Sequence, residues 1–509
     1  MGDGRCALRW LLGVIATAVA IGGVAWADDS LSARGLGEIL VRKGLITREE
    51  LQGALEESNK DRAAEAARPQ EREQGQAAEA APAEATKQTQ AAEASRLEAI
   101  EAKLPKWLAM LTPFGDLRLR DEGFYQDELH ARNRGRFRAR LGLTVAPSDE
   151  VSATFRLASG NPNDPISNNQ TFDSAFTKKP VNFDWAYITL KPTKTIGLDR
   201  PWLTVTAGKF GVNAYRPSEL VWDEDVAVEG ATEMLDLFER RQGFLHSVRV
   251  SAFQWIVDEV ANGGDPWIPG GQVVVDMAPS ERSAWTLALA DYEYVHINEV
   301  AAKFLNPFTD PPTNSKPNSS FNSQLANSNS VVRDANGKIL RYKDGFNILN
   351  VSTELNASDP FGMHLPAGLF GDFAYNTQAN GRNVGLYAGA GIGNAGKDWY
   401  RDTLRNPGDW GVSYTYAWVE KDSVLSIFTF SDINEFSTRP AKSGAARPTQ
   451  KGGTNLGVHI VRIDYVLFPN LQLTAKAYIE NVLERKISDA ALTGNPTLVR
   501  TQLDAMLRF

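Results

Sequence analysis

The sequence predicts an all-β fold in which about sixteen antiparallel strands close into a transmembrane β-barrel. Three observations predict it: an export signal opens the chain, apolar and polar residues alternate along many segments after Phe114, and the connections between these segments differ in length in a regular order. After the signal, no segment has the roughly eighteen continuous apolar residues that indicate a helical membrane span. A membrane crossing by this chain would therefore be made by strands.

Residues 1–27 have the three parts of a secretory signal. A start with two arginines is followed by an almost wholly apolar run at 11–24 and by the small-x-small cleavage site Ala25-Trp26-Ala27. The apolar run is shorter than the roughly twenty residues of a spanning helix. We therefore expect the signal peptide to be cleaved; the alternative is a retained membrane anchor.

Composition and charge narrow the class of protein. Hydrophobic residues make up 42% of the chain, the mean hydropathy is −0.31 and the formal net charge is −8 at pH 7. A β-barrel can have this composition because only every second strand residue faces lipid. The acidic balance argues against a nucleic-acid-binding protein, whose surface is basic. The one cysteine, Cys6, lies in the signal, so we expect an exported chain without disulfides that a hydrogen-bond ladder holds together.

Before the barrel we expect a short helical periplasmic extension at 28–57 and a linker at 58–110. Within 31–57, apolar residues have helical spacing with one break, and Thr47 with Glu50 forms a capping box for a second helix. This helix-turn-helix element would bind peptidoglycan or a periplasmic partner, or would be a spacer, which we favour. The linker is rich in Ala, Glu and Gln and cannot bury a core, so it is disordered or partly helical.

The barrel is predicted over 111–509. Basic or small residues alternate with apolar ones at 136–145, and polar residues alternate with apolar ones at 410–418 and 471–480. In a lipid-facing barrel the apolar set points outward and the polar set lines the lumen. The predicted strands are 114–125, 134–147, 150–158, 181–191, 202–209, 226–235, 242–257, 271–278, 284–292, 346–356, 367–378, 383–393, 409–430, 453–466, 470–481 and 499–509.

The lengths of the connections test the barrel separately, because periplasmic turns should be short and external loops long. With the first strand running outward, tight turns fall at 147–150, 279–283 and 468–470. Dividing 409–435 into two strands at Glu420–Ser423 gives an odd strand count and breaks the order of loops. As one long strand it gives an even count of about sixteen with both termini inside, and eighteen is the alternative. The predicted external loops are 159–180, 210–225, 258–270, 293–345, 431–452 and 482–498.

The last predicted strand ends on Phe509, an aromatic residue that carries the terminal carboxylate. From Val499 to Phe509, apolar residues fall on one face and mostly polar ones, from Arg500 to Arg508, on the other. A period of two suits a half-buried strand. A terminal aromatic on such a strand resembles the membrane-insertion signal of outer-membrane β-barrels, and we expect Phe509 to serve as that signal.

Several motifs spread over most of the exported chain carry a family resemblance. They lie at 40–47, 114–120, 133–140, 157–162, 168–171, 178–180, 207–209, 220–225, 369–373 and 419–422. They include Phe114-Gly115-Asp116-Leu117-Arg118-Leu119-Arg120 and Leu220-Val221-Trp222-Asp223-Glu224-Asp225. In these motifs the chain resembles the putative porins of Gram-negative bacteria. The resemblance implies a porin barrel of the outer membrane, assembled as a homotrimer, and does not supply a substrate.

Two groups of residues are candidates for selecting solutes. One is a pore-lining basic ladder on adjacent strands, which points inward if the alternation is right: Arg118, Arg120, Arg136, Arg138 and Arg140. The other is the loop 210–225, because the loop at this place in porins often folds into the lumen. This candidate constriction loop contains Arg216, Glu219, Asp223, Glu224 and Asp225. Acidic groups facing a basic wall would create a transverse field that favours polar solutes. The alternatives are salt-bridged filling for the ladder and a solvent-exposed turn for the loop.

Signals for catalysis are nearly absent from the sequence. The five histidines are scattered without metal-ligand spacing, no G-x-S-x-G elbow occurs, and the glycine-rich run at 389–393 lies within a predicted strand. We expect no enzyme activity, no cofactor and no metal. The predicted function is that of a porin, surrounded by outer-membrane lipid, through which small hydrophilic solutes and ions diffuse passively. The alternative is a barrel scaffold or sleeve that anchors a periplasmic or extracellular partner.

Overall fold

The computed structural model describes residues 107–509 with gaps at 127–130, 198–199, 241, 262, 307–326, 394–403, 405, 434–435, 437–451, 485, 488–489 and 492–496. These residues belong to one compact unit, Pro105–Phe509. The predicted signal peptide, the helical extension and nearly all of the linker lie outside the described residues. Among the residues described, no helix is long and apolar enough to cross a membrane.

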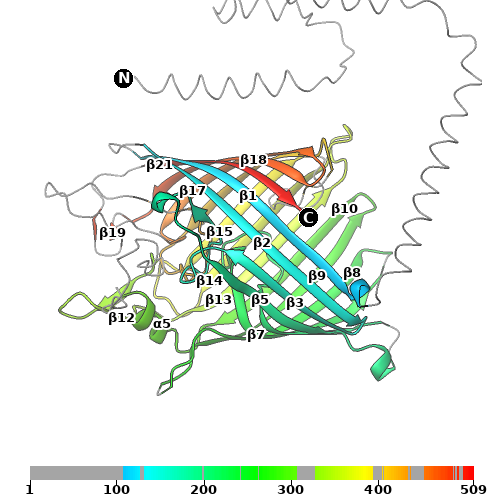
Figure 1. Cartoon of the computed structure of the whole chain (residues 1–509), viewed down its shortest axis with the longest axis horizontal. Coiled ribbons are helices and arrows are strands. Elements are labelled where there is room, and N and C mark those ends of the chain that lie inside the picture. Colours follow the sequence, from blue (N-terminus) through cyan, green and yellow to red (C-terminus); the bar gives the residue numbers. More distant parts are fainter. Residues whose placement is uncertain are drawn as a thin grey trace, which may run out of the picture. The chain divides into compact units, whose positions relative to one another are not determined.

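Sixteen antiparallel strands form a closed barrel, which confirms the predicted fold class (Figure 1). In chain order they are β1 (Leu111–Gln126), β2 (Arg132–Ser148), β3 (Val151–Ser159), β5 (Val181–Leu190), β6 (Leu203–Gly211), β7 (Ala227–Glu239), β8 (Leu245–Ile256), β9 (Trp267–Ser280), β10 (Ser283–Glu293), β13 (Asn347–Ala357), β14 (Ala367–Asn376), β15 (Val384–Ile392), β16 (Trp410–Val419), β17 (Leu456–Phe468), β18 (Leu471–Val482) and β21 (Thr497–Arg508). Each predicted strand has a counterpart in this order. A short extra strand, β4 (Gln170–Thr171), pairs with β2.

The alternation of apolar and polar residues places two different surfaces on the two sides of the wall. On β1, the side chains of Leu117 and Leu119 face outward and are 42% and 50% exposed. Arg118, which lies between the two leucines, and Arg120, which follows Leu119, are buried in the lumen. Lipid accommodates the apolar set, and the polar set remains inside, where charged partners are available.

The barrel closes between its first and last strands, β1 and β21. The N–H of Gly115 donates to the carbonyl oxygen of Phe509 at 2.9 Å, and the N–H of Phe509 donates to the carbonyl oxygen of Gly115 at 3.1 Å. A Cβ atom at position 115 would lie 2.5 Å from the carbonyl oxygen of Arg140 and 2.7 Å from the Phe509 ring. A glycine is therefore required where the end of the chain meets the first strand.

The tightest turns and the longest connections lie at opposite ends of the barrel. The tight turns are 149–150, 281–282 and 469–470, and they fall where the sequence predicted them. The longest connections include 160–180, 212–226, 294–346 and 420–455. The order has exceptions, because 393–409 is a long connection at the end of the tight turns and 377–383 is a short one at the other end.

The predicted strand 409–430 is wrong in its second half. β16 ends at Val419, and Glu420–Ser423 forms a turn, as its sequence signal suggested. Beyond the turn, Val424 and Leu425 are fully buried inside the barrel. A packed lumen and a lipid bilayer are both apolar surroundings, so apolar residues after the turn resembled a continued lipid-facing strand. The even strand count survives because the segment forms no further strand.

The long connection predicted at 293–345 is also more than an external loop. It contains α5 (Ile297–Phe304) and a small hairpin of β11 (Val331–Arg333) and β12 (Ile339–Tyr342). The helix buries three apolar side chains, Ile297, Val300 and Ala301, and these join the main core.

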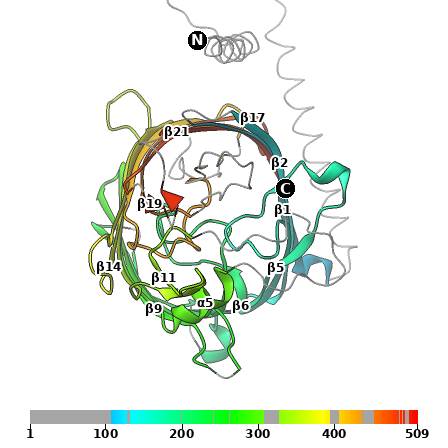
Figure 2. The same ribbon diagram turned by 90° about the vertical axis from the view of Figure 1, so that its left-hand side faces the viewer.

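One side of the lumen is filled by an aromatic core. Trp222 packs edge-on against Trp255 of β8 and Tyr292 of β10, with ring centroids 5.3 and 5.5 Å away. It also stacks on Phe428, at 5.7 Å. Figure 2 shows α5, β9 and β11 on one side of the barrel and β2, β17 and β21 on the opposite side. The core therefore belongs to the α5 side, and the opposite wall remains for polar groups.

Candidate functional site

The connection between β6 and β7 folds into the lumen and forms the lumen loop (residues 212–226). Leu220 and Trp222 are at most 1% exposed, so the tip of the loop is anchored in the aromatic core. The Ser218 hydroxyl donates to a carboxylate oxygen of Asp372 on β14 at 2.5 Å. The predicted constriction loop thus lies inside the barrel and not in external solvent.

The connection after β16 supplies a second lumen segment (residues 420–433), which packs against the lumen loop. The Thr429 hydroxyl donates to the carbonyl oxygen of Leu220 at 2.7 Å, and the N–H of Asp223 donates to the carbonyl oxygen of Phe428 at 2.8 Å. Asn329, from the connection between β10 and β13, also holds the second segment: its side-chain amide donates to the carbonyl oxygens of Lys421 and Val424, each at 2.8 Å. The two connections therefore hold each other within the lumen.

The five arginines of the predicted ladder all point into the lumen, from β1 and β2. The strand register places Arg118 directly opposite Arg138 and Arg120 directly opposite Arg136. Like charges in such positions repel each other. The repulsion is relieved by carboxylates that lie among the guanidinium groups, the first of which is Asp116, 3.1 Å from Nε of Arg138.

The lumen loop provides further carboxylates to the ladder. Arg138 donates to Glu224 at 2.8 Å and lies 3.4 Å from Asp225. Arg140 donates to Asp116 at 2.6 Å and also lies 3.4 Å from Asp225. Such charge-assisted hydrogen bonds are the strong ones in proteins, so the ladder holds the acidic end of the lumen loop against the wall.

A second ionic cluster fixes the second lumen segment to the seam of the barrel. Arg120 donates to Asp504 of β21 at 2.7 Å and to Asp432 at 2.8 Å. Arg500 of β21 donates to Asp432 at 2.9 Å and to Glu122, which is fully buried, at 2.8 Å. Burial opposes the ionisation of Asp432, but Arg120 and Arg500 outweigh it and hold its pKa well below the ordinary value. Glu122 is contacted in addition by Arg134 and Arg136.

Two carboxylates of the lumen loop, Glu219 and Asp223, form no ion pair among the described residues. Glu219 accepts the N–H of Glu224 at 2.7 Å, and Asp223 accepts the N–H groups of Asp225 and Ser431, each at 2.8 Å. Burial, and next the charge of Glu224, raises the pKa of Glu219 to about 8. Burial, and next the charges of Glu219 and Asp225, raises the pKa of Asp223 well above its ordinary value.

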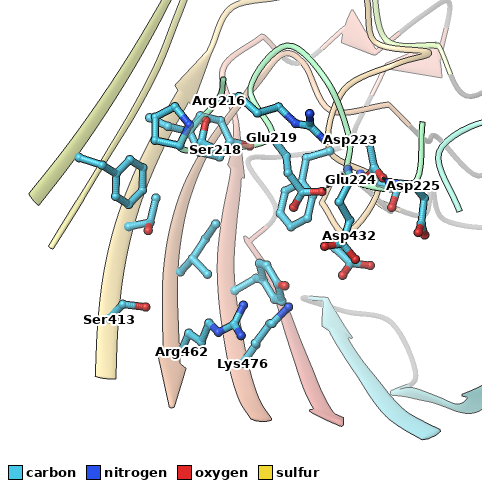
Figure 3. A pocket seen from close by; sticks show the side chains of 18 of the residues that line it. Arg216, Ser218, Glu219, Asp223, Glu224, Asp225, Ser413, Asp432, Arg462 and Lys476 are labelled. Carbon is cyan, nitrogen blue, oxygen red and sulfur yellow. Dashed lines mark hydrogen bonds between the residues drawn. The ribbon is translucent and has the colours of Figure 1, made fainter. Parts of the chain in front are cut away.

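Between the lumen loop and the opposite wall lies the constriction cavity, of about 270 Å³. Its wall side includes Ser413 of β16, Arg462 of β17 and Lys476 of β18. Figure 3 shows these three below the loop, with Asp432 at the side. The cavity thus has the carboxyl groups of the lumen loop, together with Arg216 of the same loop, on one side and Arg462 and Lys476 on the other.

The predicted site residues divide into two groups around this cavity. Arg118 and all five residues singled out in the constriction loop line it: Arg216, Glu219, Asp223, Glu224 and Asp225. The other four ladder arginines do not belong to the lining. They lie behind the carboxylates that they bind, so most of the ladder is salt-bridged.

Sequence reasoning missed several residues of the site. Arg462 and Lys476 occupy inward positions of strands that the alternation did identify, so they could have been found. Asp432 could not, because its segment was predicted to be external. Among the residues described, no three His, Cys, Asp or Glu side chains are placed to hold a metal ion.

Comparisons with known proteins give one family and a set of distant structures. The profile of a family described as "Putative porin" matches residues 124–438. A search of curated proteins gave no match. Among solved structures, Pseudomonas putida OprB is 12% identical, with 79% of this chain and 94% of that one covered and a TM-score of 0.45. Salmonella typhi OmpF in complex with daunomycin is 8% identical, with 78% of this chain and 97% of that one covered and a TM-score of 0.42. The outer membrane channel DcaP of Acinetobacter baumannii is 10% identical, with 78% of this chain and 97% of that one covered and a TM-score of 0.36.

Proposed function

The chain belongs to the putative porin family, and from this premise we propose that it is an outer-membrane channel whose constriction cavity sorts small hydrophilic solutes by charge. The observation that carries the proposal is the cavity itself. It lies inside a closed barrel, between a lumen loop rich in carboxyl groups and a wall that bears Arg462 and Lys476. A solute that crosses there passes through a field directed across the pore, which orders dipolar solutes and disfavours apolar ones.

Within this proposal the two predicted groups of site residues have different roles. The lumen loop narrows the lumen and presents its carboxyl groups to the solute. The ladder arginines Arg120, Arg136, Arg138 and Arg140 position that loop and the second lumen segment, while Arg118 contacts the solute path directly. A barrel that only anchors a partner is the less favoured function, because the family is one of porins.

Three further parts of the proposal concern export and assembly. The signal peptide directs export of the chain and is then cleaved. The exported chain inserts with the help of Phe509 and assembles as a homotrimer in outer-membrane lipid. The element at 31–57 serves as a spacer or contacts peptidoglycan. These parts rest on the sequence patterns and on the family resemblance.

The test is single-channel conductance of the refolded, signal-free protein in planar bilayers. We expect stable conductance steps, in groups of three if the trimer is the inserted unit. A protein that is folded by heat-modifiable electrophoretic mobility, inserts into the bilayer and passes no current would contradict the channel function. That result would favour the scaffold.

A further inference from the structure

We infer that the constriction cavity is a binding site for small organic carboxylates, so that the channel passes anions more readily than cations. The inference rests on the proposed channel function and names the solute class of the same site. A row of donors on three neighbouring strands carries it, formed by Ser413, Arg462 and Lys476.

The strand register builds this row. Ser413 of β16 lies directly opposite Arg462 of β17, and Arg462 lies directly opposite Lys476 of β18. All three line the cavity, and Figure 3 shows them side by side on its wall. Two cations directly opposite each other on paired strands repel unless negative charge lies near them. The row therefore favours an anion in the cavity.

The neighbouring carboxylate satisfies only one of the two cations. Asp464 accepts Nε of Arg462 at 2.6 Å and Nη2 at 2.9 Å. In the part of the chain that the structure describes, neither the Lys476 ammonium nor the Ser413 hydroxyl has a hydrogen-bond or ion-pair partner. An ammonium group with three donors is suited to the oxygens of a carboxylate, and Ser413 lies on the other side of Arg462 as a further donor in the row.

The charged carboxylates across the cavity are already compensated by the ladder and the seam. Asp432 is bonded to Arg120 and Arg500, and Glu224 is bonded to Arg138. Their charges are therefore largely cancelled before a solute arrives. They leave the positive charge of Lys476 without an equal partner.

Burial opposes the ionisation of the two remaining acidic groups, Glu219 and Asp223. Neither forms an ion pair among the described residues, and burial raises the pKa of each, that of Glu219 to about 8 although the charge of Lys476 opposes the rise. The charged and titratable groups that face Glu219 come from its own loop, from the second lumen segment, from β15 and from β18. They are Asp223, Glu224, Asp432, Tyr387 and Lys476. Because ionisation of Glu219 and Asp223 is opposed, Arg462 and Lys476 face fewer negative charges than the acidic composition of the cavity indicates.

The experiment measures the reversal potential of the full exported chain in planar bilayers under a gradient of potassium chloride, and then of potassium acetate. We expect the wild-type channel to be anion-selective. In Lys476→Gln the anion-to-cation permeability ratio should be about fivefold lower, because one unit charge a few ångströms away in water contributes about that factor. Lys476→Arg should keep the preference. The matched control Lys338→Gln removes an exposed charge in the β11–β12 turn and should leave the ratio unchanged.

The outcomes separate this inference from the channel function. Loss of all current in the folded wild type would overturn the channel and the inference together. Current with cation selectivity, or with a selectivity that Lys476→Gln leaves unchanged, would overturn the inference alone. If Lys476→Gln does not fold, the Lys476→Arg channel still decides, because a preference for cations in that channel or in the wild type contradicts an anion site.

Discussion

The carboxyl group of Glu219 lies in the same cavity as the ammonium group of Lys476, and its raised pKa makes its charge dependent on pH near neutrality. Below a pH of about 8 the folded protein holds Glu219 protonated, and above that pH the carboxylate forms. We expect the preference for anions to fall, by about fivefold for one added negative charge, as the pH rises through about 8. Reversal potentials measured at several pH values on the same inserted channels check this.

The isosteric variant Glu219→Gln is the control for this titration. It cannot ionise, so its selectivity should stay constant over the same pH range. A step near pH 8 that persists in Glu219→Gln would assign the titration to another group.

The ladder arginines bind mainly to carboxylates of the protein itself, and only Arg118 lines the cavity. Arg138 bonds Asp116 and Glu224, and Arg120 bonds Asp504 and Asp432. A buried charge without its partner is costly, typically about 3–5 kcal/mol. Substitution of these arginines would therefore disturb folding together with selectivity. For this reason Lys476, which forms no ion pair with any residue that the structure describes, is the sharper probe of selectivity.

At the scale of elements, the largest apolar anchor of the lumen loop is Trp222. Its ring packs on Trp255, Tyr292 and Phe428. Truncation of a buried tryptophan to alanine costs about 3–5 kcal/mol. We expect Trp222→Ala to release the loop, widen the constriction cavity and raise the single-channel conductance, with faster entry of larger sugars into proteoliposomes.

Trp202→Ala is the matched control for the anchor. Trp202 lies before β6 and is 40% exposed, and its main-chain hydrogen bond to Asp236 does not need the ring. An equal rise in conductance in both variants would mean that general loosening of the barrel, and not release of the lumen loop, is the cause.

The sequence identified the strands because each strand separates two different solvents, lipid outside and polar groups inside, and alternation records this difference. It identified the ladder for the same reason. It failed for the second lumen segment, where Val424 and Leu425 are apolar because they pack in the lumen. Alternation cannot tell which apolar surroundings a residue meets. The pairing of Arg120 with Asp432, 312 positions away, also leaves no local signal.

At the scale of the whole molecule, we expect Phe509 to serve both in closure of the barrel and in its insertion. Its main chain is hydrogen-bonded to Gly115, whereas its ring is 62% exposed. We expect Phe509→Ser to keep the ability to refold in detergent, because the main-chain bonds remain, but to reach the outer membrane in reduced amount. Cell fractionation combined with heat-modifiable mobility measures both properties.

Phe468→Ser is the control for that prediction, because Phe468 is a similarly exposed aromatic at the end of β17. If both variants are depleted from the outer membrane to the same extent, loss of exposed aromatic surface explains the effect, and Phe509 is not a specific signal.

The seam between β1 and β21 also has a consequence for biogenesis. Arg120 and Glu122 are made early, yet their partners Asp504 and Arg500 are translated last, 384 and 378 positions later. A nascent or prematurely terminated polypeptide that lacks β21 would have to bury both charges without these partners. We therefore expect a product without β21 to leave the barrel open. Such a product would remain accessible to periplasmic chaperones and proteases.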